Sequence, residues 1–394
     1  MSAPRALFVS HTAVLGGAER MLLDLVGGWD GERRVALLSD GPFRAALEAR
    51  AVPVTVEPLG ALGATRRESA APGIGALVDV ARLATKLAEP AREADVIHAN
   101  TQKAFVVAAA AGLIARRPVV WHLHDILTTA HFSASNIKAA VMLANSRAAA
   151  VIVNSEATAA AFRDAGGKAG LVHVVYNGIP SAPYDAVTDA ECRALRAATH
   201  DERAFVIAAC GRLAPWKGQH VLVAALEALP DATAWIIGRA LFGEDRYAET
   251  IRIQAKELGV SDRVRFLGER EDVPALLRAA DVVVHTAVEP EPFGRVVVEG
   301  MLARHPVIAA DAGGVREIIT AADEATRTGW LTPPGDPATL AEAVRTVRAL
   351  TPDARDAIVA RAYADAVARF SPAVMVTGVA EVLAAVVSGR RRRT

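Results

Sequence analysis

Two glutamates stand in an apolar setting in the second half of the chain. The segment 289–314 reads EPEPFGRVVVEGMLARHPVIAADAGG, with Glu291 before a run of valines and Glu299 inside it. A buried carboxylate without a partner costs free energy or is forced to protonate, so something polar must meet Glu299. If a helix begins near Phe293, the two glutamates lie at most about 12 Å apart along its axis.

That separation is comparable to the span from a sugar to a ribose across a diphosphate. Glu291 can then accept hydrogen bonds from sugar hydroxyls and Glu299 from ribose hydroxyls, because carboxylates are strong acceptors. The helix N-terminus, formed by Phe293, Gly294 and Arg295, favours phosphates between them. The alternative is that Glu299 points to solvent or pairs with an arginine. For the pair of glutamates around PFG, we favour the ligand-binding interpretation.

Two cations follow a predicted strand in IAACGRLAPWKGQ. The strand ends at Gly211, and Arg212 and Lys217 come before the next helix. A phosphate-binding loop of the Walker type is excluded, because Gly218 and Gln219 follow the lysine where that loop requires Ser or Thr. The cations can balance a diphosphate; the alternative is a solvated basic loop. The chain contains no Asp-x-Asp pair, so we expect no metal clamp of that type.

Gly16 and Gly17 lie between a predicted strand and a helix in SHTAVLGGAERMLLDL. Paired glycines let a phosphate approach the backbone, and the helix N-terminus that follows favours an anion. An ordinary glycine turn is an equal alternative for such a pair. The histidines at 98, 122, 124 and 131 lack helical metal spacing, so no metal site is expected. We expect His124 to lie in a cleft, past the end of its strand.

These segments must be positioned by two parallel sheets. Short apolar, β-branched runs alternate with alanine-rich helical patterns, which is typical of parallel sheets covered by helices on both faces. In such sheets ligands bind beyond the carboxyl ends of the strands. The predicted strands are 6–10, 35–39, 54–56, 96–99, 119–122, 150–153, 172–176, then 205–209, 234–237, 264–267, 282–285, 307–309 and 329–331.

The α/β fold is therefore expected to form two doubly wound domains. The turn-rich NGIPSAPY marks a boundary, which gives a first domain of residues 1–185 and a second of 186–372. Residues 373–394 form a last apolar helix and a tail that ends in RRRRT. Such a tail is most often solvated; binding to a membrane or an acidic partner is the minority interpretation.

Composition excludes several classes of partner and location. Lys plus Arg and Asp plus Glu both number 44, so no nucleic-acid partner is indicated. A membrane surface is possible but not indicated. Two cysteines suit a reducing cytoplasm, and the short apolar run at 6–9 does not fit a signal peptide. The apolar stretch 104–115 is well short of the ~20 residues of a spanning helix.

The motifs together resemble the retaining glycosyltransferases of family 4, which have the GT-B fold of two facing Rossmann-like domains. The resemblance rests on EPFGRVVVEGMLARHPVIAADAGGVREII, GRLAPWKG, VRFLGEREDVPALLRAADVVVHTA and GWLTPPGDPATLAEAV. Its densest part covers about residues 205–345. Thinner matches in the first half are GGAER, DVIHAN, WHLHD and VVYNGI. Pro180 replaces the family's usual aspartate, and the segment after Gly238 lacks the usual compact glycine turn.

The resemblance implies a donor that is a nucleoside-diphosphate sugar, UDP before GDP, and no other cofactor. The second domain would hold the donor, and the first domain the acceptor: a small molecule, a glycan or a lipid-linked sugar. The last helix would cross back onto the first domain. The implied roles are diphosphate binding by Gly211, Arg212, Lys217 and the Gly16–Gly17 loop, and sugar binding by Glu291 and the amides around Phe293 and Gly294. Glu299 would bind the ribose, and the base would lie near Leu267 to Arg270. His124 would lie beside the sugar.

The resemblance also implies transfer with retention of anomeric configuration and without a metal ion, with Arg212, Lys217, Glu291 and His124 as the catalytic residues. Two alternatives stay open. One is another GT-B enzyme, a phosphorylase or a sugar-nucleotide epimerase. The other is a pseudoenzyme that binds the nucleotide sugar only to support a partner.

Overall fold

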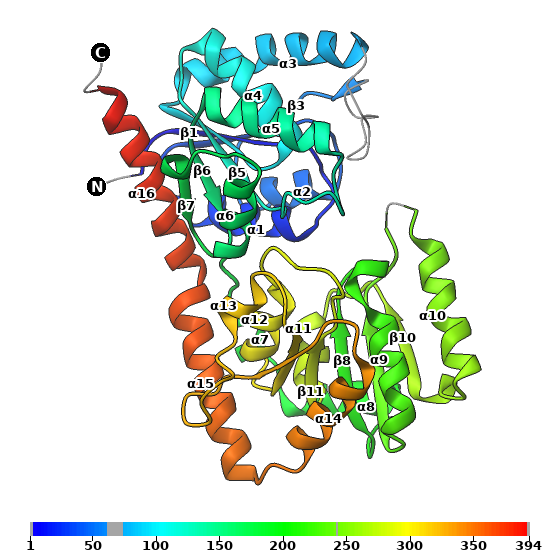
Figure 1. Cartoon of the computed structure of the whole chain (residues 1–394). Helices are drawn as coiled ribbons and strands as arrows, with labels where there is room; N and C mark the ends of the chain where they lie inside the picture. The colour runs from blue at the N-terminus through cyan, green and yellow to red at the C-terminus, as the bar shows by residue number, and fades with distance from the viewer. Residues whose placement is uncertain (1–2, 61–73, 242, 392–394) are drawn as a thin grey trace. The chain divides into compact units, whose positions relative to one another are not determined.

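The chain divides into two compact α/β units. The computed structural model describes residues 3–60, 74–241 and 243–391 of the 394-residue chain. Unit 1 comprises Met1–Gly178 and Pro372–Thr394, and unit 2 comprises Ile179–Ser371 (Figure 1). The boundary between the units thus lies at 178/179, inside the turn-rich segment NGIPSAPY, whereas the sequence predicted it at 185/186. The short helix α7 (Ala182–Asp185) goes with unit 2 because Asp185 accepts a 2.9 Å hydrogen bond from Tyr363 and pairs with Arg304 at 3.2 Å.

Unit 1 is built on a seven-stranded sheet. The strand order is β3-β2-β1-β4-β5-β6-β7, and every neighbouring pair is parallel. The strands are nearly continuous apolar runs, as expected for a sheet that is covered on both faces. Their bounds are β1 (Ala6–Ser10), β2 (Arg33–Leu37), β3 (Val54–Val56), β4 (Val96–Ala99), β5 (Val119–Leu123), β6 (Ala148–Val153) and β7 (Val172–Val174).

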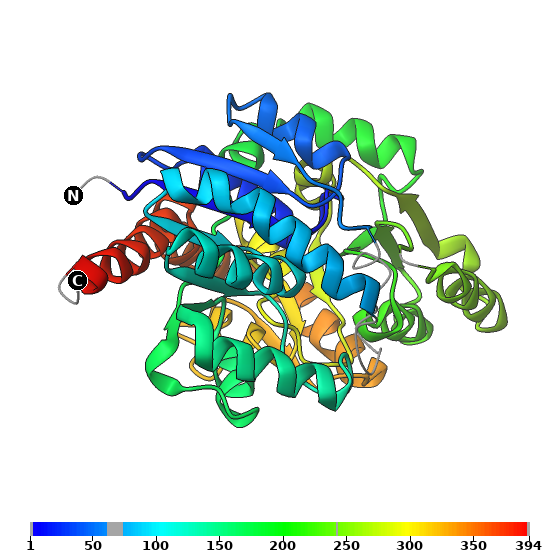
Figure 2. The same cartoon turned by 90° about the horizontal axis from the view of Figure 1, so that it is seen from above.

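Helices cover both faces of this sheet (Figure 2). One apolar core joins the sheet to α3, α4, α5 and α6, and a second joins its other face to α1, α2 and α16. The helix bounds are α1 (Gly17–Gly27), α2 (Pro42–Glu48), α3 (Ile74–Glu93), α4 (Gln102–Ala115), α5 (Ala134–Arg147), α6 (Glu156–Asp164) and α16 (Pro372–Arg391).

The last helix, α16, belongs to unit 1 although it follows unit 2 in the chain. Met375, Val379 and Leu383 are at most 1% exposed and pack in the same core as α1. The segment Pro352–Arg390 is long and apolar enough to cross a membrane by length and composition alone. Since one side of α16 is buried in the core of unit 1, the same composition is also what a core helix requires.

Unit 2 is built on a six-stranded parallel sheet. The strand order is β10-β9-β8-β11-β12-β13. The predicted pair of doubly wound parallel sheets is therefore confirmed, and each predicted strand is present with bounds that differ only slightly. The bounds are β8 (Phe205–Cys210), β9 (Ala232–Ile237), β10 (Val264–Gly268), β11 (Val282–His285), β12 (Val307–Ala310) and β13 (Trp330–Thr332).

The helices of unit 2 also lie on both faces of its sheet. One core joins the sheet to α9, α10 and α14, while α11 and α12 pack on β8, β11 and β12. The further bounds are α8 (Asp189–Ala198), α9 (Gln219–Ala225), α10 (Asp245–Glu257), α11 (Val273–Ala279), α12 (Arg295–Leu302), α13 (Val315–Ile318), α14 (Pro337–Arg348) and α15 (Pro352–Phe370).

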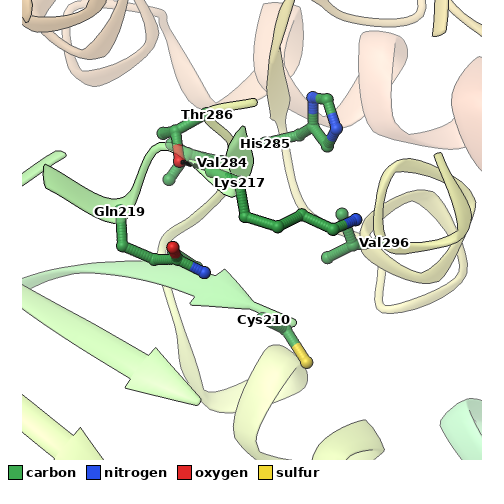
Figure 3. Close-up of a pocket in the computed structure, with 8 residues that line it drawn as sticks. Cys210, Lys217, Gln219, Val284, His285, Thr286 and Val296 are labelled. Atoms are coloured by element: carbon green, nitrogen blue, oxygen red, sulfur yellow. Dashed lines mark hydrogen bonds between the residues drawn. The ribbon is translucent and has the colours of Figure 1, made fainter. Parts of the chain in front are cut away.

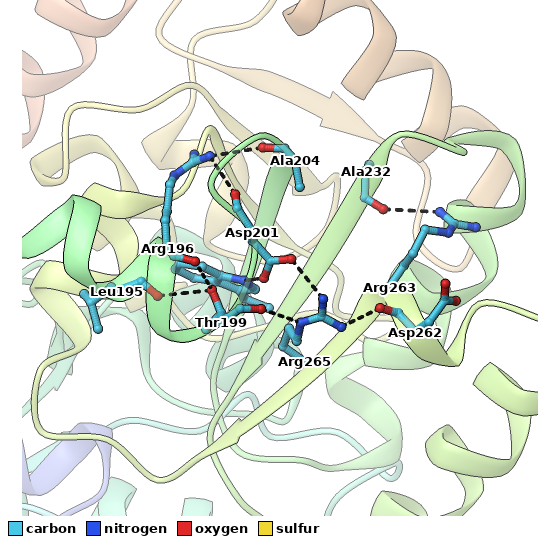
Figure 4. A network of polar contacts seen from close by, with 10 residues as sticks. Leu195, Arg196, Thr199, Asp201, Ala204, Ala232, Asp262, Arg263 and Arg265 are labelled. Atoms are coloured by element: carbon cyan, nitrogen blue, oxygen red, sulfur yellow. Dashed lines mark hydrogen bonds and ion pairs between the residues drawn. The ribbon is translucent and has the colours of Figure 1, made fainter.

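A polar network joins the loop before β8 to the strands β9 and β10 (Figure 4). Asp201, only 2% exposed, accepts a 2.8 Å hydrogen bond from Trp235 Nε1 and a 3.1 Å one from Arg265 Nη2. Arg196 donates to the carbonyl of Ala204 at 3.0 Å. The network ties the loop before β8 to side chains of β9 and β10.

Candidate functional site

Backbone contacts fix Glu291 directly before helix α12. Glu291 forms an isolated parallel bridge with Gly313, and the amide of Gly314 donates a 2.9 Å hydrogen bond to its carbonyl. A Cβ at position 313 would lie 2.2 Å from that carbonyl oxygen, and φ there is +66°, so the position requires glycine. Gly294, with φ +100°, then turns the chain into α12. The EPFG sequence therefore sets a carboxylate just ahead of a helix N-terminus.

The carboxylate of Glu291 is held between two basic side chains. Lys217 Nζ lies 2.5 Å from Oε1, and His285 Nε2 lies 2.5 Å from Oε2. Burial raises the pKa of the Glu291 carboxyl, but Lys217 and His285 outweigh burial and hold the pKa far below its ordinary value of 4.5. Glu291 therefore stays ionised, and its orientation is set from two sides.

Lys217 itself is anchored through its backbone. Thr286 Oγ1 donates a 3.0 Å hydrogen bond to the Lys217 carbonyl. Gly218 has φ +69°, and a Cβ there would lie 1.9 Å from the carbonyl oxygen of Thr286, so no larger residue fits. The ammonium also lies 4.3 Å from the centre of the Trp216 ring, a favourable cation–π distance.

Lys217 and His285 line a small pocket at the carboxyl ends of β8 and β11 (Figure 3). In this view the lysine extends toward the start of α12 at Val296. Among the residues that the structure describes, His285 Nδ1 is a buried atom without a hydrogen-bond partner. The other lining residues are Ala209, Cys210, Gln219, Val284 and Thr286.

Arg212 faces a different carboxylate, Glu244, at 3.2 Å. Burial raises the pKa of the Glu244 carboxyl, and the charge of Arg212 opposes that rise. The guanidinium also lies 5.8 Å from the Trp216 ring. Gln219 Nε2 donates a 2.9 Å hydrogen bond to the Arg212 carbonyl. Trp216 thus lies beside both cations of the loop, and each cation has its own acidic partner.

Glu299 does meet an arginine on its own helix. Arg295 Nε lies 3.6 Å from Glu299 Oε1, one turn away on α12, and the two side chains are 18% and 16% exposed. The arginine alternative considered for this glutamate is thus present in the structure, but at a distance too long for a hydrogen bond. The Glu299 side chain is thus neither fully buried nor hydrogen-bonded to Arg295.

Glycines occupy the carboxyl ends of β8, β9 and β10. Gly211, Gly238 and Gly268 all have positive φ values, and a Cβ at 238 would lie 2.0 Å from the Gly211 carbonyl oxygen. Leu267 is part of β10, whereas Arg270 follows it and forms a bidentate pair with Asp272 at 2.7 and 2.6 Å. The guanidinium of Arg270 is thus engaged within its own loop.

Gly16, Gly17 and His124 belong to unit 1, and the other predicted site residues to unit 2. Gly16 caps α1 in an extended conformation and has no side chain with which to bond the first-turn amides. Glu19, 5% exposed, already places a carboxylate in that first turn. His124 follows β5, and its Nε2 lies 3.0 Å from Asn100 Oδ1.

Sequence reasoning missed His285, Trp216 and Glu244 in unit 2 and Asn100 in unit 1. His285 could have been found, because it ends a predicted strand at the ligand-binding edge of the sheet. Asn100 carries the same signal, because it directly follows the predicted strand 96–99, whereas Glu244 does not directly follow a predicted strand. Within residues 3–60, 74–241 and 243–391, no group of three or more His, Cys, Asp or Glu side chains could hold a metal ion.

Comparisons with known proteins match both units. The family described as "Glycosyl transferases group 1" matches residues 193–365, and "Glycosyltransferase Family 4" matches residues 15–182. Among solved structures, Alr3699/HepE of Anabaena in complex with UDP and glucose is similar with a TM-score of 0.86 and 40% identity, over 97% of this chain and 99% of that one. A glycosyltransferase from Rickettsia africae shares the fold, with a TM-score of 0.80 at 17% identity.

The curated relatives match over shorter segments. A D-inositol 3-phosphate glycosyltransferase of Mycobacterium sp. (strain KMS) is 36% identical over 150 residues, which is 36% of this chain and 34% of the relative. LpsE of Rhizobium meliloti, a lipopolysaccharide core biosynthesis glycosyltransferase, is 36% identical over 109 residues, 28% of this chain and 30% of that one. The matches thus span about a third of these relatives' length.

The resemblance found in the sequence motifs is therefore confirmed over nearly the whole chain. Two parallel α/β units, with 40% identity to Alr3699/HepE across 97% of the residues, establish the GT-B fold, and the chain belongs to glycosyltransferase family 4.

Proposed function

We propose that this protein transfers a hexose from a UDP-sugar to an acceptor hydroxyl, with retention of anomeric configuration. The observation that carries the proposal is the Glu291 carboxylate, clamped between Lys217 and His285 directly before α12. An ionised acceptor suits sugar hydroxyls, and a lysine beside a helix N-terminus suits a diphosphate. The UDP-glucose complex of Alr3699/HepE, 41% identical over 97% of this chain, supports UDP as the nucleotide.

The donor's charged centre is assigned to the loop between β8 and α9. Lys217 and Arg212 meet the diphosphate, together with the amides at Gly211 and at Phe293–Arg295. Negative charge grows on the diphosphate as the bond to the sugar breaks, so fixed cations lower the barrier electrostatically. To reach the diphosphate, Lys217 exchanges part of its contact with Glu291 for the phosphate oxygens, while His285 keeps the carboxylate oriented.

The two ends of the donor are assigned to the two glutamates. Glu291 accepts hydrogen bonds from hydroxyls of the transferred sugar. Glu299 accepts them from the ribose, in competition with the 3.6 Å contact to Arg295. The base lies near Leu267 to Arg270, where the positive φ of Gly268 opens the end of β10.

In the reaction the bond between the anomeric carbon and the leaving phosphate oxygen breaks, and a bond from the acceptor oxygen to that carbon forms on the same face. The acceptor's proton passes to the departing diphosphate. No protein nucleophile is required. From unit 1, His124 is assigned a place beside the transferred sugar and the Gly16–Gly17 loop a place beside the diphosphate. The absence of an Asp-x-Asp pair from the sequence supports transfer without a metal ion.

The test is a donor-by-acceptor screen read by mass spectrometry. UDP-glucose and other UDP-hexoses should give a product heavier by one hexose with at least one class of small-molecule, glycan or lipid-linked acceptor. EDTA should leave turnover unchanged, and GDP-sugars should react more slowly. Phosphorolysis or epimerisation of the donor without an organic acceptor would favour the other GT-B enzymes. Donor binding without turnover across the screen would favour a nucleotide-sugar-binding pseudoenzyme.

A cytoplasmic location is also proposed. Its support is compositional: the sequence contains two cysteines, Cys192 and Cys210, which are too few for a disulfide framework, as is usual for proteins in a reducing compartment. Fractionation of cells that express the full chain tests the proposal. Recovery of the protein with the membrane pellet, resistant to salt, would contradict it.

A further inference from the structure

A chain of hydrogen bonds at the carboxyl edge of the unit 1 sheet ends on His124. Asn100, fully buried directly after β4, donates from Nδ2 to the carbonyl of Ala18 at 3.1 Å. Its Oδ1 lies 3.0 Å from His124 Nε2, directly after β5. The amide of Asn100 also donates to the carbonyl of Val9 at 2.8 Å, which fixes the backbone of the asparagine. The side chain therefore has one carbonyl on one side and one imidazole on the other.

This arrangement determines which imidazole nitrogen carries the proton. The Ala18 carbonyl can only accept, so the NH2 group of Asn100 must face it and the side-chain oxygen must face His124. That oxygen also only accepts, so the hydrogen lies on His124 Nε2. Burial, helped by His98, lowers the pKa of His124 to about 3, so the ring is neutral and carries a single N–H. Nδ1 is left with a lone pair.

The lone pair on Nδ1 has no partner in the part of the chain that the structure describes. The ring stacks on His122 with centroids 4.2 Å apart and planes at 26°. His122 in turn lies 3.1 Å, Nδ1 to Nε2, from His98. These two histidines are at most 1% exposed, whereas His124 is partly buried as a residue, with its Nδ1 atom itself buried. The stack limits rotation of the His124 ring, so its free nitrogen has a fixed direction.

We propose that Asn100 is a positioning residue which holds His124 as the Nε2–H tautomer, so that Nδ1 accepts a hydrogen bond from a sugar hydroxyl. The choice of hydroxyl as the ligand group follows from the chemistry: a neutral imidazole nitrogen with a lone pair recognises a donor, and it rejects a group that only accepts. The inference rests on the proposed function, since it assigns the hydrogen-bonding role of one residue to the sugar site of that reaction. It makes His124 an element of sugar discrimination and not a proton donor.

The first test is a direct measurement of the tautomer. NMR of the full chain labelled with ¹⁵N-histidine, at about pH 8 and thus above the ordinary imidazole pKa, distinguishes the protonated from the unprotonated nitrogen of each ring. The His124 signal, assigned by its loss in His124→Gln, should show hydrogen on Nε2. Hydrogen on Nδ1 would overturn the proposal without any variant at Asn100, and it would say nothing against sugar transfer.

Variants of Asn100 test the cause of the tautomer. Asn100→Leu removes the acceptor and should give a mixture of tautomers, whereas Asn100→Asp retains an acceptor and should keep hydrogen on Nε2. The matched control is Asn154→Ala. Asn154 is also a buried asparagine directly after a strand, β6, but it accepts from Thr158 at 3.1 Å. The control should leave the His124 tautomer unchanged, and an equal change in it would indicate a general loss of structure instead.

Kinetics connect the tautomer to sugar recognition. In UDP-hexose donors, one hydroxyl at a time at C3, C4 or C6 is replaced by fluorine, which can accept but not donate. One position should lower kcat/KM about tenfold in the natural chain, the effect expected when one buried hydrogen bond is lost. The same replacement should cost His124→Ala little, and it should cost Asn100→Leu, with its mixture of tautomers, less than it costs the natural chain. An unchanged fluorine effect in both variants would overturn the proposal, while transfer absent from the natural chain would instead overturn the proposed function.

Discussion

Lys217 Nζ lies 2.5 Å from Glu291 Oε1, so the cation assigned to the diphosphate is in contact with the carboxylate assigned to the sugar. The two side chains are 19% and 12% exposed, so water screens the pair only weakly. A whole donor offers a new partner to both groups, whereas a free nucleoside diphosphate offers one only to the lysine. In the proposed function, the pair therefore couples recognition of the sugar to recognition of the diphosphate beside it.

Lys217→Met should lower turnover much more than it lowers stability. We expect kcat to fall about 100-fold, because the lysine opposes charge that grows in the transition state. The free energy of unfolding should fall by about 1–3 kcal/mol, since Glu291 keeps its hydrogen bond to His285. Steady-state kinetics and urea denaturation measure the two quantities. A double variant, Lys217→Met with Glu291→Gln, should regain stability but not turnover; recovery of turnover would mean that the pair is purely structural.

His285→Ala should make the reaction more sensitive to acid. Loss of one basic partner raises the pKa of the Glu291 carboxyl, which Lys217 and His285 together hold far below 4.5. A carboxyl with a lowered folded pKa stabilises the protein above its unfolded pKa, and that contribution is lost as the pH falls through the folded one. The acidic limb of the kcat/KM profile should therefore shift to higher pH. His305→Gln is the control and should leave the acidic limb in place. His305 is a half-buried histidine of the same unit, and its Nε2 lies 2.8 Å from the Arg278 carbonyl. Superimposable pH profiles for the natural chain and His285→Ala would contradict the prediction.

Unit 1 should lose stability as the pH falls from 6.5. Burial lowers the pKa of both His98 and His124 from 6.5 to about 3. The unfolded chain takes up these protons below pH 6.5 and the folded one does not, so stability is complete above 6.5 and is lost toward pH 3. Each histidine contributes at most about 1.4 kcal/mol per pH unit.

Hydrogen exchange of the β4 and β5 amides between about pH 7.5 and 5, corrected for intrinsic rates, measures this loss. The range avoids the titration of ordinary carboxylates. His98→Gln should reduce the slope by the contribution of one histidine. A flat dependence of the opening free energy over this range would show that the buried rings are not kept neutral by the fold.

The order of strands and helices could be predicted because the chain carries it locally. Continuous apolar strands such as Val282–His285 and Val307–Ala310 are characteristic of sheets that are buried on both faces. A helix start directly after Glu291 could also be predicted, although α12 begins at Arg295, after the left-handed Gly294, and not near Phe293 as expected. The exact boundary between the two units could not be predicted, because it depends on tertiary contacts of Asp185 with Tyr363 and Arg304.

The partners of the site residues could not be predicted, because they come from distant segments. His285 and Lys217 meet on Glu291 only when β8 and β11 lie side by side. Asn100 meets His124 only when β4 pairs with β5. The sequence thus indicates which polar groups lie at the strand ends, while the sheet order decides which groups contact them.

Asp201→Ala should destabilise unit 2 strongly without touching the site. The Asp201 side chain is 1% exposed and pairs with Arg265 at 3.1 Å, while Trp235 Nε1 donates to it at 2.8 Å. Its removal leaves a buried indole N–H without an acceptor, so we expect a loss of about 3 kcal/mol in urea denaturation. Asp311→Ala is the control: its pair with Arg316 has side chains 61% and 40% exposed, and should change stability by about 1 kcal/mol or less. Equal losses of unfolding free energy in the two variants would mean that the buried network of Asp201 stabilises the unit no more than an exposed ion pair does.

Glu291→Gln and Glu299→Gln should separate the sugar end of the donor from its nucleotide end. Glu299→Gln replaces an ionised acceptor at the ribose by a neutral one, so the Kd of free UDP and of the UDP-sugar should rise alike, by roughly tenfold or more for about 1.5–3 kcal/mol. Glu291→Gln should weaken the UDP-sugar but not UDP, because its partners are sugar hydroxyls. It also releases Lys217 from the 2.5 Å ion pair, so UDP should bind at least as tightly as to the natural chain. Calorimetric titration of both variants with both ligands decides the matter: if Glu291→Gln weakens free UDP as much as Glu299→Gln does, sugar and nucleotide do not lie along α12 in the proposed order.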